Sequence, residues 1–172
     1  DTCENEGALY PDLWQYRGEY ESAVTTALES RFQISGQDGL VKQLARIAIQ
    51  LADERWTNYQ RDILSAAEGS FLEELDELNI SLAFQRITAA SIALTIMSRC
   101  GMDPENYFEA EDFEDLPNFN TVPVITQLGQ AVSEAAEQVL RKIEAAVKAY
   151  RPEAGKAVRQ APRRAPEGKA AP

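Results

Sequence analysis

The sequence predicts an all-α fold of about five helices in a compact orthogonal or bundle-like domain. Apolar residues recur at three- and four-residue steps over several stretches, as on one face of a helix. No stretch shows the strict alternation of a strand, and Gly, Pro, Ser and Asp stand where the periodic stretches begin and end. With 172 residues, of which 44% are hydrophobic, the chain can bury a core without disulfides or metals.

Composition divides the chain into three regions. We expect an N-terminal arm over residues 1–17, a helical domain over 18–150, and a disordered tail or linker over 151–172. The tail consists mainly of Ala, Pro, Lys, Arg and Glu and has no large apolar side chain to bury beyond a valine. Because the chain does not begin with Met, we interpret it as processed or as part of a longer polypeptide.

The first half of the domain predicts two helices. The first covers residues 18–32, and a turn at 35–39 offers Asp38 as an N-cap for the next. A long second helix over 40–67 is expected, with an alternative break near Thr57-Asn58, where helix propensity falls. Its apolar stripe contains Leu40, Leu44, Ile47, Ala48, Leu51, Tyr59, Ile63 and Ala66.

Three further helices are expected. Ser70 with Glu73 forms a capping-box pattern before a short helix over 71–78, with Leu72, Leu75 and Leu78 inward and Asn79 as its terminator. Ser81 would cap a helix that runs to Cys100, and Gly101 would end it. Residues 102–120 are irregular except for one turn over 104–108. Thr121 would cap the last helix, whose stripe contains Ile125, Leu128, Val132, Ala135, Val139, Ile143, Ala146 and Tyr150.

The chain contains no histidine, which removes most common catalytic and metal-binding chemistry. Ser-His-Asp and Cys-His nucleophiles, His-containing zinc sites and the His pairs of di-iron bundles are all excluded. The glycine-rich nucleotide-binding loops are also missing. We therefore expect no enzyme and no cofactor, although an enzyme built on carboxylates alone stays as a third hypothesis.

Charge is divided unevenly along the chain. The net charge is −11, made of −15 over residues 1–150 and +4 over residues 151–172. The acidic body should repel nucleic acid and anionic membranes, so we expect a protein partner. No unbroken apolar run approaches about 18 residues, and the N-terminus does not resemble a secretory signal. Two cysteines far apart, Cys3 and Cys100, argue against a disulfide scaffold and favour a reducing cytoplasm.

Two groups of residues are candidates for a partner surface. Aromatic residues of the arm either pack onto the body, which we favour, or form a short binding peptide. An acidic run either forms a solvated loop held by its aromatic neighbours, which we favour, or a calcium site, although it lacks an internal Gly. The candidate residues are Tyr10, Trp14, Tyr16, Glu109, Glu111, Asp112, Glu114 and Asp115.

Other clusters have simpler interpretations. Glu73, Glu74, Asp76 and Glu77 are expected to form a polar helix face rather than a metal site. Trp14, Trp56, Tyr59 and Tyr107 are expected to pack in the core rather than stack on bases, because stacking sites need a basic groove. Cys100 is expected to be buried and structural rather than nucleophilic.

Two stretches, Phe84–Tyr107 and Leu128–Ile143, resemble the helical C-terminal part of antirestriction-type (ArdC/LtrC-like) proteins of Firmicutes conjugative elements. That family carries a helix with a Glu zinc ligand, then a Gly-hydrophobic-Asp-x-x-x-Tyr turn, which Gly101 to Tyr107 resembles, and a long final helix. Here the HExxH helix has no counterpart, and no carboxylate stands at Ala89 to Ser91. The resemblance implies a non-catalytic relative or accessory module in a bacterial cytoplasm.

Two function hypotheses follow. The first is a non-enzymatic helical interaction or accessory module of a bacterial mobile-element protein. The alternative is an acidic decoy that mimics DNA and inhibits a restriction enzyme or nuclease, which requires carboxylates spaced like phosphates along one elongated surface.

Overall fold

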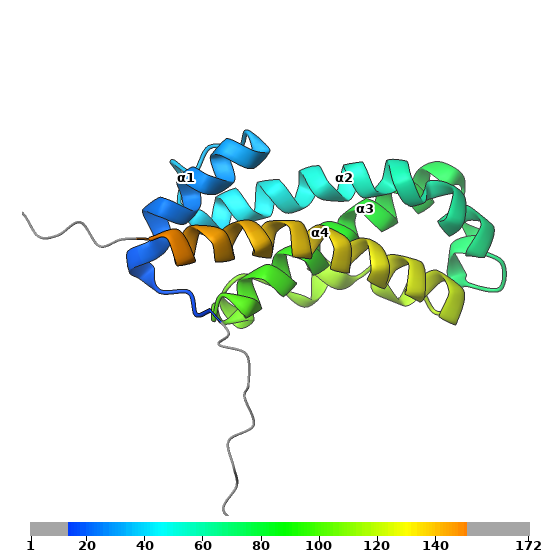
Figure 1. Ribbon diagram of the computed structural model, residues 1–172. Coiled ribbons are helices and arrows are strands. Elements are labelled where there is room, and N and C mark those ends of the chain that lie inside the picture. The colour runs from blue at the N-terminus through cyan, green and yellow to red at the C-terminus, as the bar shows by residue number, and fades with distance from the viewer. Residues whose placement is uncertain (1–13, 151–172) are drawn as a thin grey trace, which may run out of the picture.

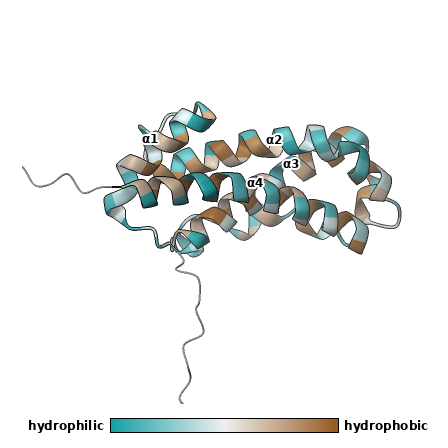
Figure 2. Ribbon diagram, viewed as in Figure 1, coloured by the Kyte–Doolittle hydropathy of each residue, from teal (hydrophilic) through white to brown (hydrophobic). Residues whose placement is uncertain are grey.

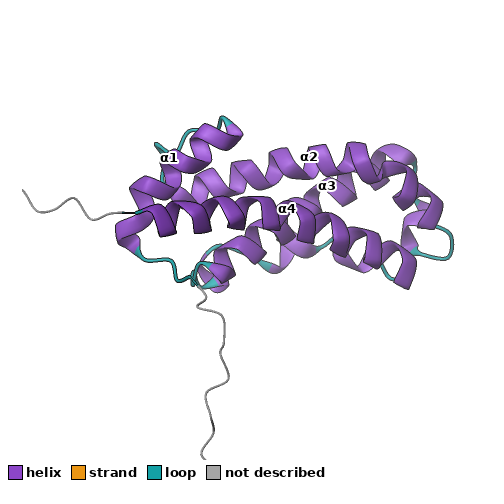
Figure 3. Ribbon diagram, in the orientation of Figure 1, coloured by secondary structure: helices purple, strands orange, loops and turns teal. Residues whose placement is uncertain are grey.

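The computed structural model describes residues 14–150, and all of their regular structure is helical (Figures 1 and 3). The all-α prediction is confirmed. Tyr10, Cys3 and the expected tail over 151–172 lie outside the described residues. The α-helices are α1 (Glu21–Phe32), α2 (Leu40–Ala66), α3 (Glu77–Arg99) and α4 (Val122–Ala149). The short 3-10 helices are η1 (Gly18–Tyr20), η2 (Phe71–Glu74), η3 (Pro104–Asn106), η4 (Ala110–Phe113) and η5 (Leu116–Asn118).

The three long helices α2, α3 and α4 pack lengthwise, and α1 lies across one end of this bundle (Figure 1). Two clusters of buried side chains follow one another along the bundle, one near α1 and the other near η2. Apolar residues interrupt the polar ones at regular intervals along each long helix, as Figure 2 shows. The Tyr20 ring contacts the Tyr150 ring edge-on, with centroids 5.1 Å apart. The two ends of the described chain therefore lie at the same end of the bundle.

Helix α3 is the most apolar of the long helices. By length and composition it could cross a membrane, with a mean hydropathy of 1.5 over its best 18-residue stretch. Half of that stretch is buried inside the bundle, as in the core helix of a helical domain. Residues at three- and four-residue steps are buried along it, among them Phe84, Ile87, Ile92 and Ile96. Helix α3 therefore packs on both α2 and α4.

The expected boundary between a short helix over 71–78 and a helix starting at Ser81 is wrong. The Ser70 hydroxyl does accept a hydrogen bond from the Leu72 amide at 3.3 Å, but the turn ends at Glu74. The Asp76 carboxylate then caps α3 by accepting from the Asn79 amide at 2.8 Å. Asn79 is therefore a first-turn residue of α3 and not a terminator, and Leu78 is 68% exposed.

The starts of α2 and α4 are capped differently from expectation, whereas the predicted continuity of α2 and the role of Gly101 are confirmed. Helix α2 runs unbroken through Thr57-Asn58, and its N-cap is Gly39, at φ 92°, because the Asp38 carboxylate instead accepts from Arg46 at 2.6 Å. Thr121 is the N-cap residue of α4, but its side chain makes no capping hydrogen bond. Ile125 is exposed, and Val124 takes its expected place in the core. Gly101 has φ 75° after α3, as its predicted role requires.

The turn between α1 and α2 is held by a buried glutamine. The Gln43 side-chain amide donates to the backbone oxygen of Ile34 at 2.8 Å and to that of Thr25 at 3.0 Å. Gly36 packs so closely here that a Cβ on it would stand 2.7 Å from the Thr25 Cβ and 3.2 Å from the Gln43 amide. The position therefore needs glycine because of space.

We expect Gly36→Ala to lower the free energy of unfolding by about 1–3 kcal/mol, because the new methyl group overpacks the α1–α2 contact. Gly129→Ala is the matched control, since nothing lies within 4 Å of its Cβ position in the middle of α4. That change should raise stability by roughly 0.5–1 kcal/mol. Urea unfolding followed by circular dichroism measures both, and equal effects of the two changes would contradict the close packing at Gly36.

Candidate functional site: a groove beside α3

The irregular residues 103–118, which we call the acidic segment, lie against α3. From the end of α3 the segment folds through η3 and η4, which contact α3, to η5, which contacts η2 (Figure 1). Just after the segment, the Phe71 amide donates to the Asn120 side chain at 3.0 Å. The segment therefore returns along α3 from its C-terminal to its N-terminal end.

Aromatic side chains hold the acidic segment to the body. Phe108 and Phe113 are half-buried, and their ring centroids are 5.9 Å apart. Phe108 packs on the core cluster near α1, and Phe113 packs on the cluster near η2. The arrangement agrees with the expectation of an acidic loop held by its aromatic residues.

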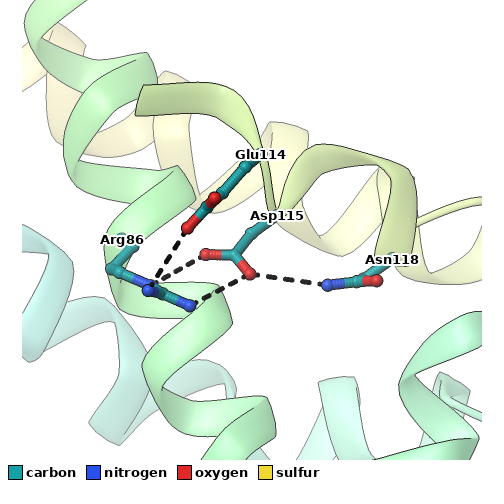
Figure 4. A network of polar contacts seen from close by, with 4 residues as sticks. All are labelled: Arg86, Glu114, Asp115 and Asn118. Carbon is teal, nitrogen blue, oxygen red and sulfur yellow. Dashed lines mark hydrogen bonds and ion pairs between the residues drawn. The ribbon is translucent and has the colours of Figure 1, made fainter. Parts of the chain in front are cut away.

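Arg86 of α3 ties the same segment through its carboxylates (Figure 4). Its guanidinium forms a bidentate contact with the Asp115 carboxylate, with Nε 2.8 Å from Oδ2 and Nη2 3.2 Å from Oδ1. Glu114 lies 3.6 Å from the same guanidinium, and Asn118 donates to Asp115 at 3.5 Å. The Asp115 side chain is only 12% exposed, whereas that of Arg86 is 61% exposed. The buried carboxylate is therefore fully hydrogen-bonded, as burial of a charge requires.

Two adjoining hollows of about 410 and 520 Å³ form one groove between α2, α3 and the acidic segment, which we call the α2–α3 groove. Ile49, Arg86 and Ala89 belong to both hollows. The Ile49 side chain is 64% exposed, so the groove presents a large aliphatic residue to solvent. The remaining lining residues are Ala45, Gln50, Asp53, Gln85, Ala90, Ala93, Tyr107, Phe108, Glu111, Asp112, Glu114 and Asp115.

Four of the predicted surface residues, Glu111, Asp112, Glu114 and Asp115, line this groove. Glu109 does not line it, but its amide donates to the Asp112 carboxylate at 2.9 Å and so helps to shape η4. Glu111 forms no ion pair with another described residue. The groove therefore combines an alanine-rich floor with a rim of carboxylates.

Negative charge is concentrated around α3. Residues 68–115 hold twelve Asp and Glu against two Lys and Arg, a net of −10. The other described residues, 14–67 and 116–150, hold ten against nine, a net of −1. The flanks of α3 thus carry nearly all of the charge imbalance of the described domain.

The aromatic residues of the arm lie at a different place. Trp14 and Tyr16 are half-buried against the core cluster near α1. The Arg99 guanidinium stacks 4.1 Å from the centre of the Trp14 ring and donates to the Trp14 backbone oxygen at 2.9 Å. Trp14 and Tyr16 therefore attach the arm to the body, and neither lines the groove.

Most of the other candidate sites take part in packing. Trp56 packs on Phe84 with ring centroids 5.5 Å apart, and Tyr59 is buried. Tyr107, which was expected in the core, is instead 45% exposed. Cys100 is 5% exposed, and burial raises the pKa of its thiol to about 11 despite the opposing effect of Arg99. No group of three or more Cys, Asp or Glu side chains within residues 14–150 is arranged to hold a metal ion. The calcium interpretation of the acidic segment thus gains no support.

The groove floor was not anticipated from the sequence, although one signal was present. Ile49 falls between the stripe positions of α2, and a large aliphatic residue on the polar side of a helix indicates an exposed apolar spot. Arg86 is one of only two basic residues among residues 68–115, so it was also a natural partner for the carboxylates.

We expect Arg86→Gln to loosen the acidic segment while the bundle stays folded, because η4 and η5 lose their main polar attachment to α3. The loss should be about 1–2 kcal/mol, below that of a fully buried pair because Arg86 is largely exposed. Hydrogen exchange should show faster exchange at residues 107–118 alone. Arg141→Gln, which removes an exposed pair with Glu137, is the control and should change stability by less than about 0.5 kcal/mol. Unchanged exchange in the Arg86 variant would contradict the attachment.

The raised thiol pKa predicts a pH dependence. The native state keeps the Cys100 proton up to about pH 11, whereas the unfolded chain loses it near pH 9. The unfolded state therefore binds fewer protons in this window, and the free energy of unfolding falls as pH rises from 9 to 11, by at most about 1.4 kcal/mol per pH unit. Burial and then Glu21 raise the pKa of Tyr16 to about 12, so its effect begins only above pH 10.

Urea unfolding of Cys100→Ala against the parent chain separates these groups. The variant should lose the slope between pH 9 and 10, and above pH 10 it should keep only the part that comes from the tyrosines. Identical slopes in the two proteins would show that the thiol does not titrate as described.

Comparison of the chain with protein-family models, with curated proteins and with solved structures gives no match. Function is therefore inferred from the groove and from the distribution of charge.

Proposed function

We propose that this domain is a non-enzymatic interaction module that binds a partner protein through the α2–α3 groove. The observation that carries the proposal is the exposed Ile49 on the groove floor beside a rim of carboxylates fixed by Arg86. An apolar floor with a polar rim is the usual arrangement of a protein interface. A role within a bacterial mobile-element protein, in the cytoplasm, is a finer proposal that rests on the sequence resemblance alone.

Site-specific cross-linking tests the proposal. A photo-reactive phenylalanine analogue at Ile49 should give one discrete cross-linked protein in cells that produce this chain. The same analogue at Glu137, exposed on α4, is the control and should not give that product. The identified partner, once purified, should bind the parent chain and bind the Ile49→Glu variant at least about tenfold more weakly, because an apolar contact becomes a buried charge.

Two results would overturn the proposal. One is equal binding of the purified partner to the parent chain and to the Ile49→Glu variant. The other is metal-dependent hydrolysis of peptides or nucleic acid by the purified chain, with loss of activity on substitution of its carboxylates.

The charge distribution favours one alternative, a decoy that mimics DNA. The acidic segment runs along α3, whose 23 residues span about 34 Å, and ends beside η2 with its own carboxylates. A net of −10 over that length corresponds to roughly one charge per 3.4 Å, the phosphate spacing along one DNA strand.

The two functions differ in which residues they need. A decoy should displace DNA from a nuclease or restriction enzyme, and the effect should weaken steeply with salt. Lysine in place of Glu73, Glu74 and Glu77 should then weaken inhibition as much as lysine in place of Glu105, Glu109 and Glu111, and Ile49→Glu should have no effect. For a partner that occupies the groove, Ile49→Glu should weaken binding strongly, and lysine in place of Glu73, Glu74 and Glu77 should have little effect.

A further inference from the structure

The floor and rim of the α2–α3 groove together specify the chemistry of an occupant. We propose that the groove binds a basic amphipathic helix of a partner protein, with its aliphatic side chains over the floor and its Lys and Arg side chains on the rim. The inference rests on the proposed function and adds the chemical class of the partner.

The floor fits aliphatic side chains. Ala45 and Ile49 of α2 face Ala89 and Ala93 of α3 across it. The short side chains of the three alanines leave the hollows of about 410 and 520 Å³ open, so large residues of a partner can enter without displacing anything. Burial of the exposed Ile49 beneath them supplies the apolar contact.

The length and direction of the groove fit a helix. Three of its four α2 residues, Ala45, Ile49 and Asp53, recur at four-residue steps over two turns, or about 12 Å. A helix laid beside α2 and α3 presents side chains at i, i+3 or i+4, and i+7 over the same distance, as in other helix-in-groove complexes.

The rim selects positive charge. Asp53 stands at one side of the groove, and Glu111, Asp112 and Glu114 stand at the side formed by the acidic segment. Arg86 is the single basic residue among the lining residues, and Asp115 and Glu114 already contact it. Asp53 accepts only an amide hydrogen bond, from Gln85 at 3.2 Å, and Glu111 forms no ion pair within residues 14–150. Cationic side chains of a partner would therefore meet carboxylates that no described cation neutralises.

Titration of the full chain into fluorescein-labelled peptides tests this inference by fluorescence anisotropy. The probe is a 14-residue helix-forming peptide of Leu and Lys, with Leu at i, i+3, i+4 and i+7. A scrambled peptide of the same composition and a Leu/Glu version are the peptide controls. We expect saturable one-to-one binding of the amphipathic Leu/Lys peptide, at least about tenfold tighter than that of the scrambled peptide, and no binding of the Leu/Glu peptide.

Matched variants locate the binding. Ile49→Glu should weaken binding about tenfold or more, since it places a charge on the apolar floor. Asp53→Lys and Glu111→Lys should each weaken it about two- to fivefold, as expected for exposed ion pairs. Leu78→Glu and Glu74→Lys make the same chemical changes at exposed positions outside the groove and should leave binding within twofold.

Equal weakening by Glu74→Lys and Glu111→Lys would overturn the inference, because binding would then follow net charge alone. Tighter binding of a peptide of residues 151–172 than of the Leu/Lys helix would also overturn it, in favour of the chain's own basic segment. If a partner cross-links at Ile49 but the Leu/Lys peptide does not bind, the proposed function stands and only the inference of a basic helical partner is rejected. Absence of both would remove both proposals.

Discussion

The need to cover α3 on more than one side organises the domain. Its apolar residues are too numerous to form one stripe, so a single neighbouring helix cannot bury them. Helices α2 and α4 cover two sides, and the acidic segment covers part of a third. The groove lies where this third cover is incomplete and where α3 exposes alanines rather than larger residues. The binding surface is thus a consequence of how the core helix is enclosed.

The acidic segment meets two opposing demands. Its carboxylates repel one another, while its phenylalanines and Asp115 must stay close to α3. The bidentate contact from Arg86 offsets that repulsion at Asp115, the most buried carboxylate of the segment. A rim held in place in this way loses little freedom on binding, which favours affinity for a complementary partner. The same residue therefore serves both the fold and the site.

The sequence predicted the long helices well because their apolar periodicity extends over many turns. Local signals were less reliable at junctions: Ser81 looks like a cap, but Asp76 lies earlier and its carboxylate starts α3 first. The 3-10 turns of the acidic segment follow from contacts between distant residues, such as Arg86 with Asp115, which have no local pattern. Four carboxylates of the site were predicted as a surface, whereas the floor around Ile49 depends on how α2 and α3 pack together.

The contact between Tyr20 and Tyr150 places the start of α1 beside the end of α4. Within a larger polypeptide, a domain whose two ends lie close together can be inserted or removed with little change to the rest of the chain. The flanking sequences would then meet at one point on the surface of the domain. The end of the bundle near η2 would lie opposite this point. Such an arrangement suits a domain that is acquired or lost as one unit.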